Sequence, residues 1–168
     1  SESSEKCRQC ASNEVAPFIG SYSCKEFDSE INILQAIYKG TNGSEWLKDT
    51  HWNNISQPIC SWYGVTCEGG KKDNHTVTEL DFTGNNLKGT ILSSVFELSS
   101  LQHLNLKDNH VFVTFDKIDQ AEKLEKLYLS NIDIGNVNGI GKAPALKELH
   151  LTNNDFTGPF PDDIFDLS

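Results

Sequence analysis

Apolar residues near the end of the chain alternate briefly and then stop at a bend. Leu149 and Leu151 are two positions apart, so on a β-strand both side chains point to the same face. Leu146 precedes them, and Phe156 follows after the alternation has ended. This pattern predicts a short strand, a turn and a return segment that cannot bury their apolar side alone. Such a unit needs copies of itself above and below it.

The same spacing occurs in three earlier stretches. The four copies start at Val77, Leu101, Leu124 and Leu146, and each has apolar residues three, five and ten positions after its first residue. An asparagine stands eight positions after the first residue in three copies. This is the leucine-rich-repeat pattern L-x-x-L-x-L-x-x-N-x-L, and it predicts an α/β solenoid with a parallel sheet. An ordinary α/β chain is disfavoured because the asparagine recurs in register with the leucines.

The recurring asparagine has a structural role. A tight bend after each strand leaves backbone N–H and C=O groups without a ladder partner, and an inward-pointing amide can bind both kinds of group. We therefore expect Asn85, Asn109 and Asn154 to form a ladder along the coil. The third copy has Ile132 at this position, with Asn131 one place earlier, so Asn131 could replace it by local slippage. We expect the third coil to be the irregular one.

The stretch Asp28–Gly40 has a helical spacing of apolar residues. Asp28 or Ser29 can cap this helix, and Gly40 and Gly43 end it. The apolar stripe consists of Ile31, Leu34 and Tyr38, with Ile33 and Ile37 beside them.

All three tryptophans of the chain, Trp46, Trp52 and Trp62, follow this predicted helix. Tryptophan clusters can bind sugars by stacking. We favour a different role, in which they close the open end of the repeat stack, because a solenoid requires a terminal cap.

The cysteines point to disulfides. Cys60 and Cys67 enclose a short loop in which Gly64 permits a turn and Val65 starts an edge strand, and we expect them to pair. Cys7-x-x-Cys10 could suggest a redox or zinc site, but no βαβ pattern or second Cys/His pair accompanies it. Cys24 is the nearest partner for this pair, and we expect a Cys10–Cys24 disulfide. Five cysteines leave one thiol over, either free or bridged to another chain or segment.

Two long stretches resemble the N-terminal cap and first repeat of plant-type leucine-rich-repeat proteins. They read LQAIYKGTNGSEWLKDTHWNNISQPICSWYGVTCEGG and VTELDFTGNNLKGTI. The family hallmark LxGxIPxxIxxL is similar to the residues that start at Leu87 and at Phe156, whereas the second and third copies lack its Gly-x-Ile-Pro part. The order of tryptophans, glycines and cysteines is most similar to that of secreted or cell-surface members from algae, stramenopiles and bacteria.

The resemblance implies a right-handed solenoid with a parallel sheet on its concave side. It implies short helices, 3₁₀ turns or extra strands on the convex side, without a regular second sheet in the second and third copies. Proteins of this family are extracellular binding modules, such as receptor-kinase ectodomains and secreted inhibitors of wall-degrading hydrolases. This chain contains no kinase.

The composition and the sequons indicate the cellular compartment of the protein and the kinds of partner that are disfavoured. The net charge of −10 argues against nucleic acid and anionic membranes as partners, and no apolar run is long enough to insert in a membrane. Three sequons place possible N-glycans on Asn42, Asn54 and Asn74. Together with the cysteines they predict a secreted or cell-surface protein in the secretory pathway.

We divide the chain into three parts. Residues 1–25 form a cysteine-containing arm, 26–76 a disulfide-bonded, partly helical cap, and 77–168 the repeats. The four repeats cover 77–100, 101–123, 124–145 and 146–168. Nothing after the fourth repeat resembles a closing cap. We therefore expect that the native chain continues or, as the less favoured alternative, that a partner subunit covers this edge.

Residues between the leucines face outward from the concave sheet and form columns across the coils. One column contains Glu79, His103, Lys126 and Glu148; the next contains Asp81, Asn105, Tyr128 and His150; the third contains Thr83, Lys107, Ser130 and Thr152. The central residues combine an aromatic ring with hydrogen-bonding groups, which suits a polar peptide or a glycan. The predicted ligand-binding patch consists of His103, Asn105, Lys126, Tyr128 and His150.

We expect a non-catalytic recognition or adhesion module that binds a protein or glycan on this patch. The alternative is a structural subunit that docks into a larger assembly by its repeat edge and N-terminal arm. No motif places a nucleophile beside a base, and His103 and His150 lie on nonadjacent coils without a third ligand for zinc. We expect no catalytic residues, no metal and no cofactor.

Overall fold

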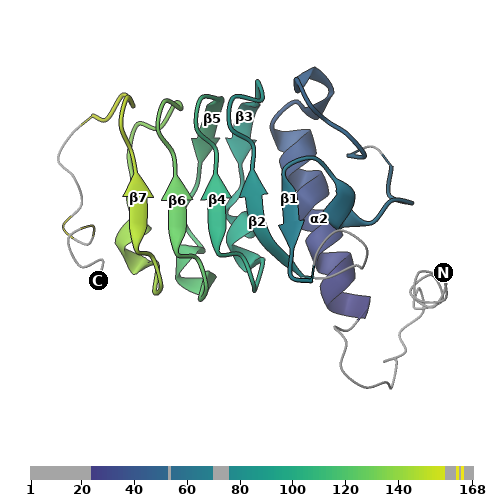
Figure 1. Cartoon of the computed structure of the whole chain (residues 1–168). Helices are drawn as coiled ribbons and strands as arrows, with labels where there is room; N and C mark the ends of the chain where they lie inside the picture. The colour runs from purple at the N-terminus through teal and green to yellow at the C-terminus, as the bar shows by residue number, and fades with distance from the viewer. Residues whose placement is uncertain (1–23, 53, 70–75, 158–161, 163, 165–168) are drawn as a thin grey trace.

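The computed structural model describes residues 24–52, 54–69, 76–157, 162 and 164 (Figure 1). Cys7, Cys10 and the Asn74 sequon lie outside the described residues, as does the side chain of Cys24. The expected Cys10–Cys24 disulfide therefore stays a prediction.

Short parallel strands from the four copies lie side by side in one sheet (Figure 1). The large sheet has the order β1-β2-β4-β6-β7, with β1 antiparallel to β2 and the other pairs parallel. Its strands are β1 Val65–Cys67, β2 Val77–Asp81, β4 His103–Asn105, β6 Lys126–Tyr128 and β7 Glu148–His150. The expected solenoid with a parallel sheet is confirmed, and Val65 begins its edge strand as predicted.

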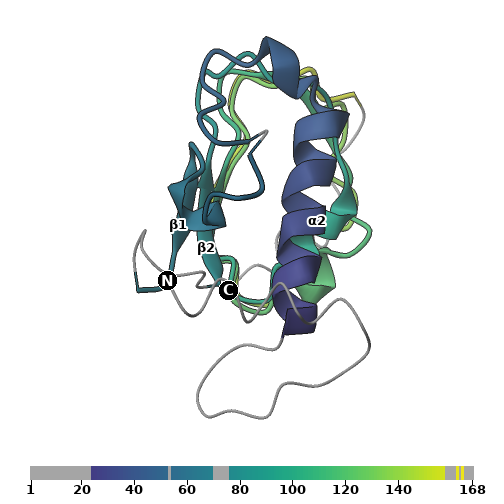
Figure 2. The same cartoon turned by 90° about the vertical axis from the view of Figure 1, so that its right-hand side faces the viewer.

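The coil closes on the opposite side through a smaller sheet and 3₁₀ turns (Figure 2). The small sheet pairs β3 Lys88–Ile91 with β5 His110–Val113. The 3₁₀ turns of the repeats are Ser93–Glu97, Ile118–Gln120 and Ile140–Lys142, and two further 3₁₀ turns, Gly43–Glu45 and Ile59–Ser61, lie in the cap. Strand β5 corrects one expectation, because the second copy forms a strand of the second sheet without the Gly-x-Ile-Pro residues. Among the described residues of the third copy no such strand occurs, so the third coil is less regular than the first two.

The leucines of the repeat fill the space between the two sides of the coil. Leu80, Leu104 and Leu127 occupy the same position in three adjacent strands, and the solvent reaches none of them. Their neighbours in the sequence point the other way, because successive side chains of a strand alternate between its faces. The large sheet therefore has a buried inner face and an outer face of polar residues.

The asparagine ladder forms, and it extends into the cap. Asn109 Oδ1 accepts hydrogen bonds from the backbone N–H of Asn85 and of Leu87, at 3.1 and 2.9 Å. Asn85 binds the backbone N–H and C=O of Lys48 in the same way, at 2.7 and 2.9 Å. In the fourth copy Asn154 Oδ1 accepts from the N–H of Ile132 at 3.1 Å. Each amide thus binds the backbone of the coil that precedes its own.

Asn131 does not replace the missing ladder asparagine, so the expected slippage is wrong. Its φ of 56° is left-handed, like those of Asp108 and Asn153, which precede the ladder position in their own copies. Its exposed side chain donates to Asp108 Oδ1 at 2.8 Å. Ile132 stays in register and is only 5% exposed. A buried isoleucine therefore replaces the amide, because the turn holds Asn131 outside the coil.

One helix, α2 Cys24–Gly40, covers the first coil opposite the large sheet (Figure 2). It begins before Asp28, so the predicted caps Asp28 and Ser29 are wrong; it ends at Gly40 as predicted. Its buried residues are Glu30, Ile33, Leu34 and Ile37, whereas Ile31 and Tyr38 are only partly buried. The buried stripe therefore lies to one side of the predicted one.

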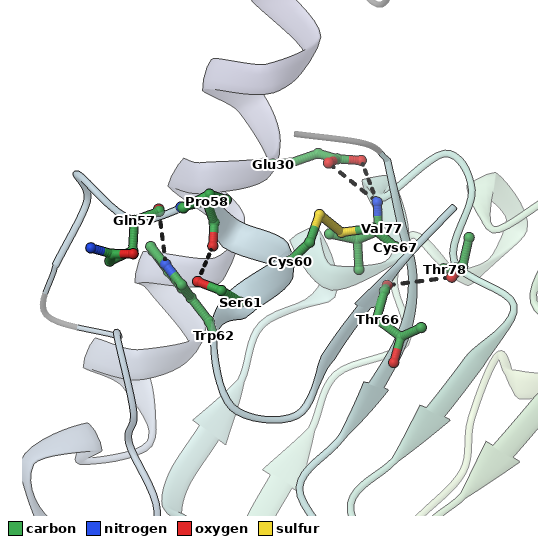
Figure 3. The surroundings of a disulfide bond; sticks show 10 residues. All are labelled: Glu30, Gln57, Pro58, Cys60, Ser61, Trp62, Thr66, Cys67, Val77 and Thr78. Carbon is green, nitrogen blue, oxygen red and sulfur yellow. Dashed lines mark hydrogen bonds between the residues drawn. A yellow bond between two sulfur atoms is a disulfide. The ribbon is translucent and has the colours of Figure 1, made fainter. Parts of the chain in front are cut away.

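Two contacts join α2 closely to the repeats. Glu30 accepts from the backbone N–H of Val77 at the start of β2, at 3.3 and 3.4 Å (Figure 3). At the other end of the helix, a Cβ on Gly89 would lie 2.2 Å from the carbonyl oxygen of Gly40. Only a residue without a side chain allows this approach. Position 89 also has a φ of +125°, which favours glycine.

The three tryptophans close the end of the coil, as predicted. Trp46, Trp52 and Trp62 are 7%, 2% and 2% exposed. Trp46 and Trp52 pack on Phe82 of the first repeat, with ring centroids 5.2 and 5.6 Å apart. Buried rings offer no face for a sugar, so the stacking alternative has no support. The expected Cys60–Cys67 disulfide is formed beside them (Figure 3).

Candidate ligand-binding face

The outer face of the large sheet, which we call the outer sheet face, carries the predicted columns in register. Glu79 pairs with His103, His103 with Lys126, and Lys126 with Glu148. Two positions further on, Asp81 pairs with Asn105, Asn105 with Tyr128, and Tyr128 with His150. The five residues of the predicted patch therefore lie together on β4, β6 and β7. The short straight strands of the repeat fix these positions.

Tyr128 lies at the centre of a row of three rings. The His103 imidazole meets it edge to face, with ring centroids 4.8 Å apart. The His150 imidazole lies on the other neighbouring strand at 4.4 Å, with only 30° between the ring planes. The phenol is thus held between two imidazoles, and of the three rings the one on His150 is the most exposed.

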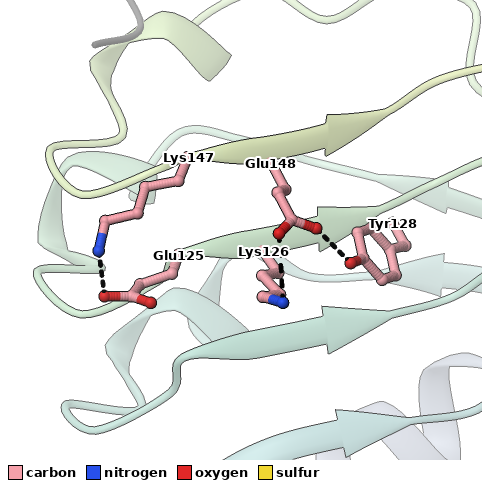
Figure 4. Close-up of polar contacts among 5 residues, drawn as sticks. All are labelled: Glu125, Lys126, Tyr128, Lys147 and Glu148. Atoms are coloured by element: carbon pink, nitrogen blue, oxygen red, sulfur yellow. Dashed lines mark hydrogen bonds and ion pairs between the residues drawn. The ribbon is translucent and has the colours of Figure 1, made fainter.

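Glu148 connects the tyrosine to a lysine (Figure 4). The Tyr128 hydroxyl donates to Glu148 Oε2 at 2.5 Å, and Lys126 Nζ lies 3.2 Å from Glu148 Oε1. The hydrogen bond from Tyr128, followed by that from Lys126, holds the pKa of Glu148 below 4.5. The same carboxylate raises the pKa of Tyr128 and of Lys126, chiefly through these hydrogen bonds. The Tyr128 hydroxyl, the Glu148 carboxylate and the Lys126 ammonium group therefore each have a polar partner within this set.

Two polar groups on β4 lack such partners. Asn105 is only 9% exposed, and its Oδ1 accepts from the backbone N–H of Lys107 at 3.2 Å. Its amide nitrogen donates to no other described residue. Nε2 of His103 is buried and likewise has no hydrogen-bond partner in the described part of the chain. Buried polar groups are usually paired, so Nε2 of His103 is an exception, whereas the amide nitrogen of Asn105 is not a buried unpaired group.

The strand next to β4 is acidic on the same face. Glu79 and Asp81 are both exposed, and Asp81 Oδ1 accepts from the backbone N–H and the hydroxyl of Thr83, at 3.0 and 2.7 Å. Neither carboxylate forms an ion pair with a described residue. The predicted patch did not include Glu79, Asp81 or Glu148. The columns could have identified these three acids, because each lies in the same column as a residue of the predicted patch.

The other predicted features have separate positions. Asn42 and Asn54 are exposed residues of the cap. No three His, Cys, Asp or Glu side chains are placed to hold a metal ion within the described ranges. None of the described helices is both long enough and apolar enough to cross a membrane.

Comparison with family models agrees with this architecture. A model of the leucine-rich-repeat N-terminal domain matches residues 27–68, and models of the leucine-rich repeat match residues 73–96 and 145–167. The chain consists of a leucine-rich-repeat cap followed by leucine-rich repeats. The first match contains the tryptophans and the disulfide, and the last contains Asn154.

The leucine-rich-repeat chain is similar to plant receptor kinases. It is 32% identical to pollen receptor-like kinase 2 of Arabidopsis thaliana over 158 residues, which cover 82% of this chain and 23% of the kinase. It is 44% identical to the nodulation receptor kinase of Pisum sativum over 59 residues, which cover 35% of this chain and 6% of that kinase. The chain therefore spans less than a quarter of either relative, and the matching part resembles an ectodomain.

Solved leucine-rich-repeat structures share the fold. A chain in the BIR3–SERK2 complex from Arabidopsis thaliana superposes with a TM-score of 0.67 at 24% identity, covering 82% of this chain and 76% of that one. At this identity the likeness shows the fold alone. It supports the arrangement of a cap and parallel coils described above.

Proposed function

We propose that this chain is an extracellular recognition module that binds a protein or glycan on its outer sheet face and catalyses no reaction. This face would be the concave side of the solenoid. The observation that carries the proposal is the clustering of His103, Asn105, Lys126, Tyr128 and His150 on three adjacent strands. Aromatic and polar groups on a rigid sheet lose little freedom on binding, which favours affinity.

The relatives support an extracellular location. The similar proteins are named as receptor kinases, and the similar solved chain belongs to a complex of two proteins. Asn42 and Asn54 are exposed, as attachment of a glycan requires. We propose that these sites and Asn74 carry glycans and that the chain passes through the secretory pathway. The resemblance to secreted members from algae, stramenopiles and bacteria stays a prediction.

A pull-down experiment tests the binding face. The wild-type chain and a Tyr128→Ala, His150→Ala variant are immobilised, and the recovered partners are compared. A His110→Ala, Phe112→Ala variant is the matched control, because it removes an exposed imidazole and an exposed ring from β5 on the small sheet. We expect the first variant to lose partners that the control retains. Equal recovery by all three proteins would contradict the proposed face.

The alternative function is that of a structural subunit in a larger assembly. Leu149, Leu151 and Phe156 of the last described coil are partly exposed, whereas the equivalent Leu127 and Leu129 are fully buried. Either a further coil of the same chain or a partner subunit would cover them. Size-exclusion mass measured with and without reductant separates the two functions: a reductant-sensitive oligomer favours assembly through the arm of residues 1–25, and a glycosylated monomer favours recognition.

A further inference from the structure

Two asparagines of the chain, Asn42 and Asn138, are directly followed by glycine. In such a pair no Cβ on the second residue hinders its backbone nitrogen from approaching the asparagine side chain. This nitrogen can attack the side-chain amide carbon, so Asn-Gly pairs are prone to spontaneous deamidation. How fast a given pair reacts depends on how readily the folded chain lets these two atoms meet. The surroundings of the two pairs differ in this respect.

Asn138 lies in an exposed turn of the third copy. Its side-chain amide binds no described residue, and only its backbone N–H is hydrogen-bonded. A single hydrogen bond, from the N–H of Ile140 to the carbonyl oxygen of Val137 at 3.1 Å, closes the turn. A Cβ added at Gly139 would meet only the carbonyl oxygen of Phe115, at 3.8 Å, so the surroundings do not crowd the reactive peptide.

Asn42 is also exposed, but the fold holds its backbone in place. Its φ of 56° and ψ of 53° are left-handed, and at this ψ the nitrogen of Gly43 points away from the Asn42 side chain. The carbonyl oxygen of Asn42 accepts from the N–H of Glu45 at 2.9 Å, and that of Gly43 accepts from Trp46 at 3.2 Å. Gly43 is buried, and a Cβ there would lie 2.2 Å from the Tyr38 ring. Attack on the Asn42 amide would require this packed turn to open.

We propose that Asn138 is a site of spontaneous deamidation and that the fold protects Asn42 from the same reaction. The Gly139 nitrogen loses its proton and attacks Cγ of Asn138, and the side-chain amide nitrogen leaves as ammonia. The product is a cyclic succinimide, which water opens at either carbonyl. Opening at Cγ leaves aspartate. Opening at the backbone carbonyl carbon leaves isoaspartate, in which the chain runs through the former side chain.

The two products should affect the third coil differently. Both carry a new carboxylate, but isoaspartate also lengthens the backbone by a methylene group. Val137 and Ile140, on either side of the pair, are 1% and 0% exposed, so they cannot follow a longer backbone without leaving the core. Isoaspartate should therefore destabilise the coil, whereas aspartate should leave it nearly intact. Gly139 has a φ of +86°, which favours glycine, so the turn itself retains the reactive pair.

Timed incubation followed by peptide mass spectrometry tests the site. The chain carries Ser44→Ala, which removes the sequon and keeps Asn42 free of glycan, and it is incubated at mildly alkaline pH in heavy-oxygen water. Uptake of heavy oxygen marks deamidation that occurred during the incubation. We expect Asn138 to react at least about tenfold faster than Asn42 in the folded chain, because local opening limits the reaction at Asn42. In urea, where no structure protects either pair, the two rates should become similar.

Three results of this incubation would overturn the proposal. The first is an equal rate at Asn138 and Asn42 in the folded chain. The second is an Asn138 that stays intact in the folded chain, whether or not it reacts in urea. The third is a difference that persists in urea, since the neighbouring sequence and not the fold would then protect Asn42.

Asn136 is the internal control for the role of Gly139. It is exposed in the same segment, but Val137 follows it, and the β-branched side chain of valine hinders attack by its nitrogen. Asn136 should therefore stay unmodified while Asn138 reacts. A rate at Asn136 equal to that at Asn138 would show that exposure alone, and not the Asn-Gly pair, determines the reaction.

Thermal unfolding tests the consequence for the coil. Ion-exchange chromatography isolates the deamidated chains, and peptide mapping gives their isoaspartate content. Asn138→Asp supplies the aspartate product directly and should unfold at nearly the wild-type temperature. The unfolding temperature of the deamidated chains should fall as their isoaspartate content rises. If these chains unfold at the same temperature as Asn138→Asp, the longer backbone does not disturb the packing of Val137 and Ile140.

Discussion

Asn109 accepts a hydrogen bond from the backbone N–H of Asn85, one coil earlier, at 3.1 Å. Its amide nitrogen donates to the carbonyl oxygens of Phe82 and Leu106 at 2.8 and 2.9 Å. Asn109 is 3% exposed, so water does not compete for the backbone groups that its amide binds. One side chain thus satisfies backbone groups of two coils and joins them.

Asn109→Ala should therefore destabilise the chain strongly. The substitution leaves two N–H groups unpaired and removes the amide donor from three carbonyl groups, and each buried unpaired group costs about 1–3 kcal/mol. We expect the free energy of unfolding, measured with urea, to fall by at least about 3 kcal/mol. Asn138→Ala is the control, since Asn138 is exposed and only its backbone is bonded. A loss at Asn109 no larger than at Asn138 would contradict the role of the ladder.

The regular part of the fold could be predicted from the sequence because it follows from a period. Leu104 and Leu127 recur at one spacing, so the strands, their register and the columns of the outer sheet face can be predicted by counting residues along the repeat. The ladder follows from the same period, since Asn85 and Asn109 stand at one position of the repeat. Where the period is broken, at Ile132, the prediction was wrong about Asn131.

Features that depend on contacts between distant residues could not be predicted in this way. The hydrogen bond from Tyr128 to Glu148 depends on which way two long side chains turn, and the spacing does not determine that. The burial of Asn105 on an otherwise polar face does not follow from the spacing either. Strand β5 forms because β3 already offers its edge, although the second copy lacks the hallmark residues. These contacts decide which groups are left for a ligand.

Gly89→Ala should prevent the close contact of the cap with the first repeat. The new Cβ would lie 2.2 Å from the carbonyl oxygen of Gly40, and neither atom can rotate away, because the Cβ is bonded directly to the backbone and the oxygen belongs to it. We expect the free energy of unfolding to fall by more than about 3 kcal/mol, measured by thermal and urea unfolding.

Gly84→Ala is the matched control for this substitution. Its φ is +59°, but a Cβ added at this position would meet no atom within 4 Å, so only backbone strain of about 1–2 kcal/mol is expected. Similar losses at both glycines would show that backbone strain alone, and no contact with Gly40, explains the need for glycine at position 89.

The ionisation of Glu148 should depend on both Tyr128 and Lys126. The hydrogen bond from Tyr128 is the largest single cause that holds the pKa of Glu148 below 4.5, and Lys126 lowers this pKa through a hydrogen bond and through its charge. A carboxyl group with a lowered pKa contributes stability above 4.5, and this contribution is lost as the pH falls through the folded-state pKa. We expect Tyr128→Phe and Lys126→Met each to raise the pKa of Glu148, measured by NMR titration of the side-chain carbon.

Stability measurements provide the second readout for this pair. Glu148→Gln should flatten the dependence of unfolding free energy on pH below 4.5, because the lowered pKa is removed. The effect should shrink at high salt, since the group is partly exposed. An unchanged Glu148 pKa in Tyr128→Phe would mean that the hydrogen bond does not persist in solution.

Ile132→Asn should be tolerated far better than asparagine at another buried isoleucine. Position 132 is in register with Asn109 and Asn154, so a new amide there would face the backbone N–H groups of Asn109 and Val111, as Asn109 faces those of Asn85 and Leu87. These bonds offset most of the lost apolar burial, and we expect a net change of about 1 kcal/mol or less. Ile140→Asn places an amide where no ladder passes and should cost more than about 3 kcal/mol. Urea unfolding compares the two variants. Equal losses of unfolding free energy would show that an amide at the ladder position is stabilised no better than an amide elsewhere in the core.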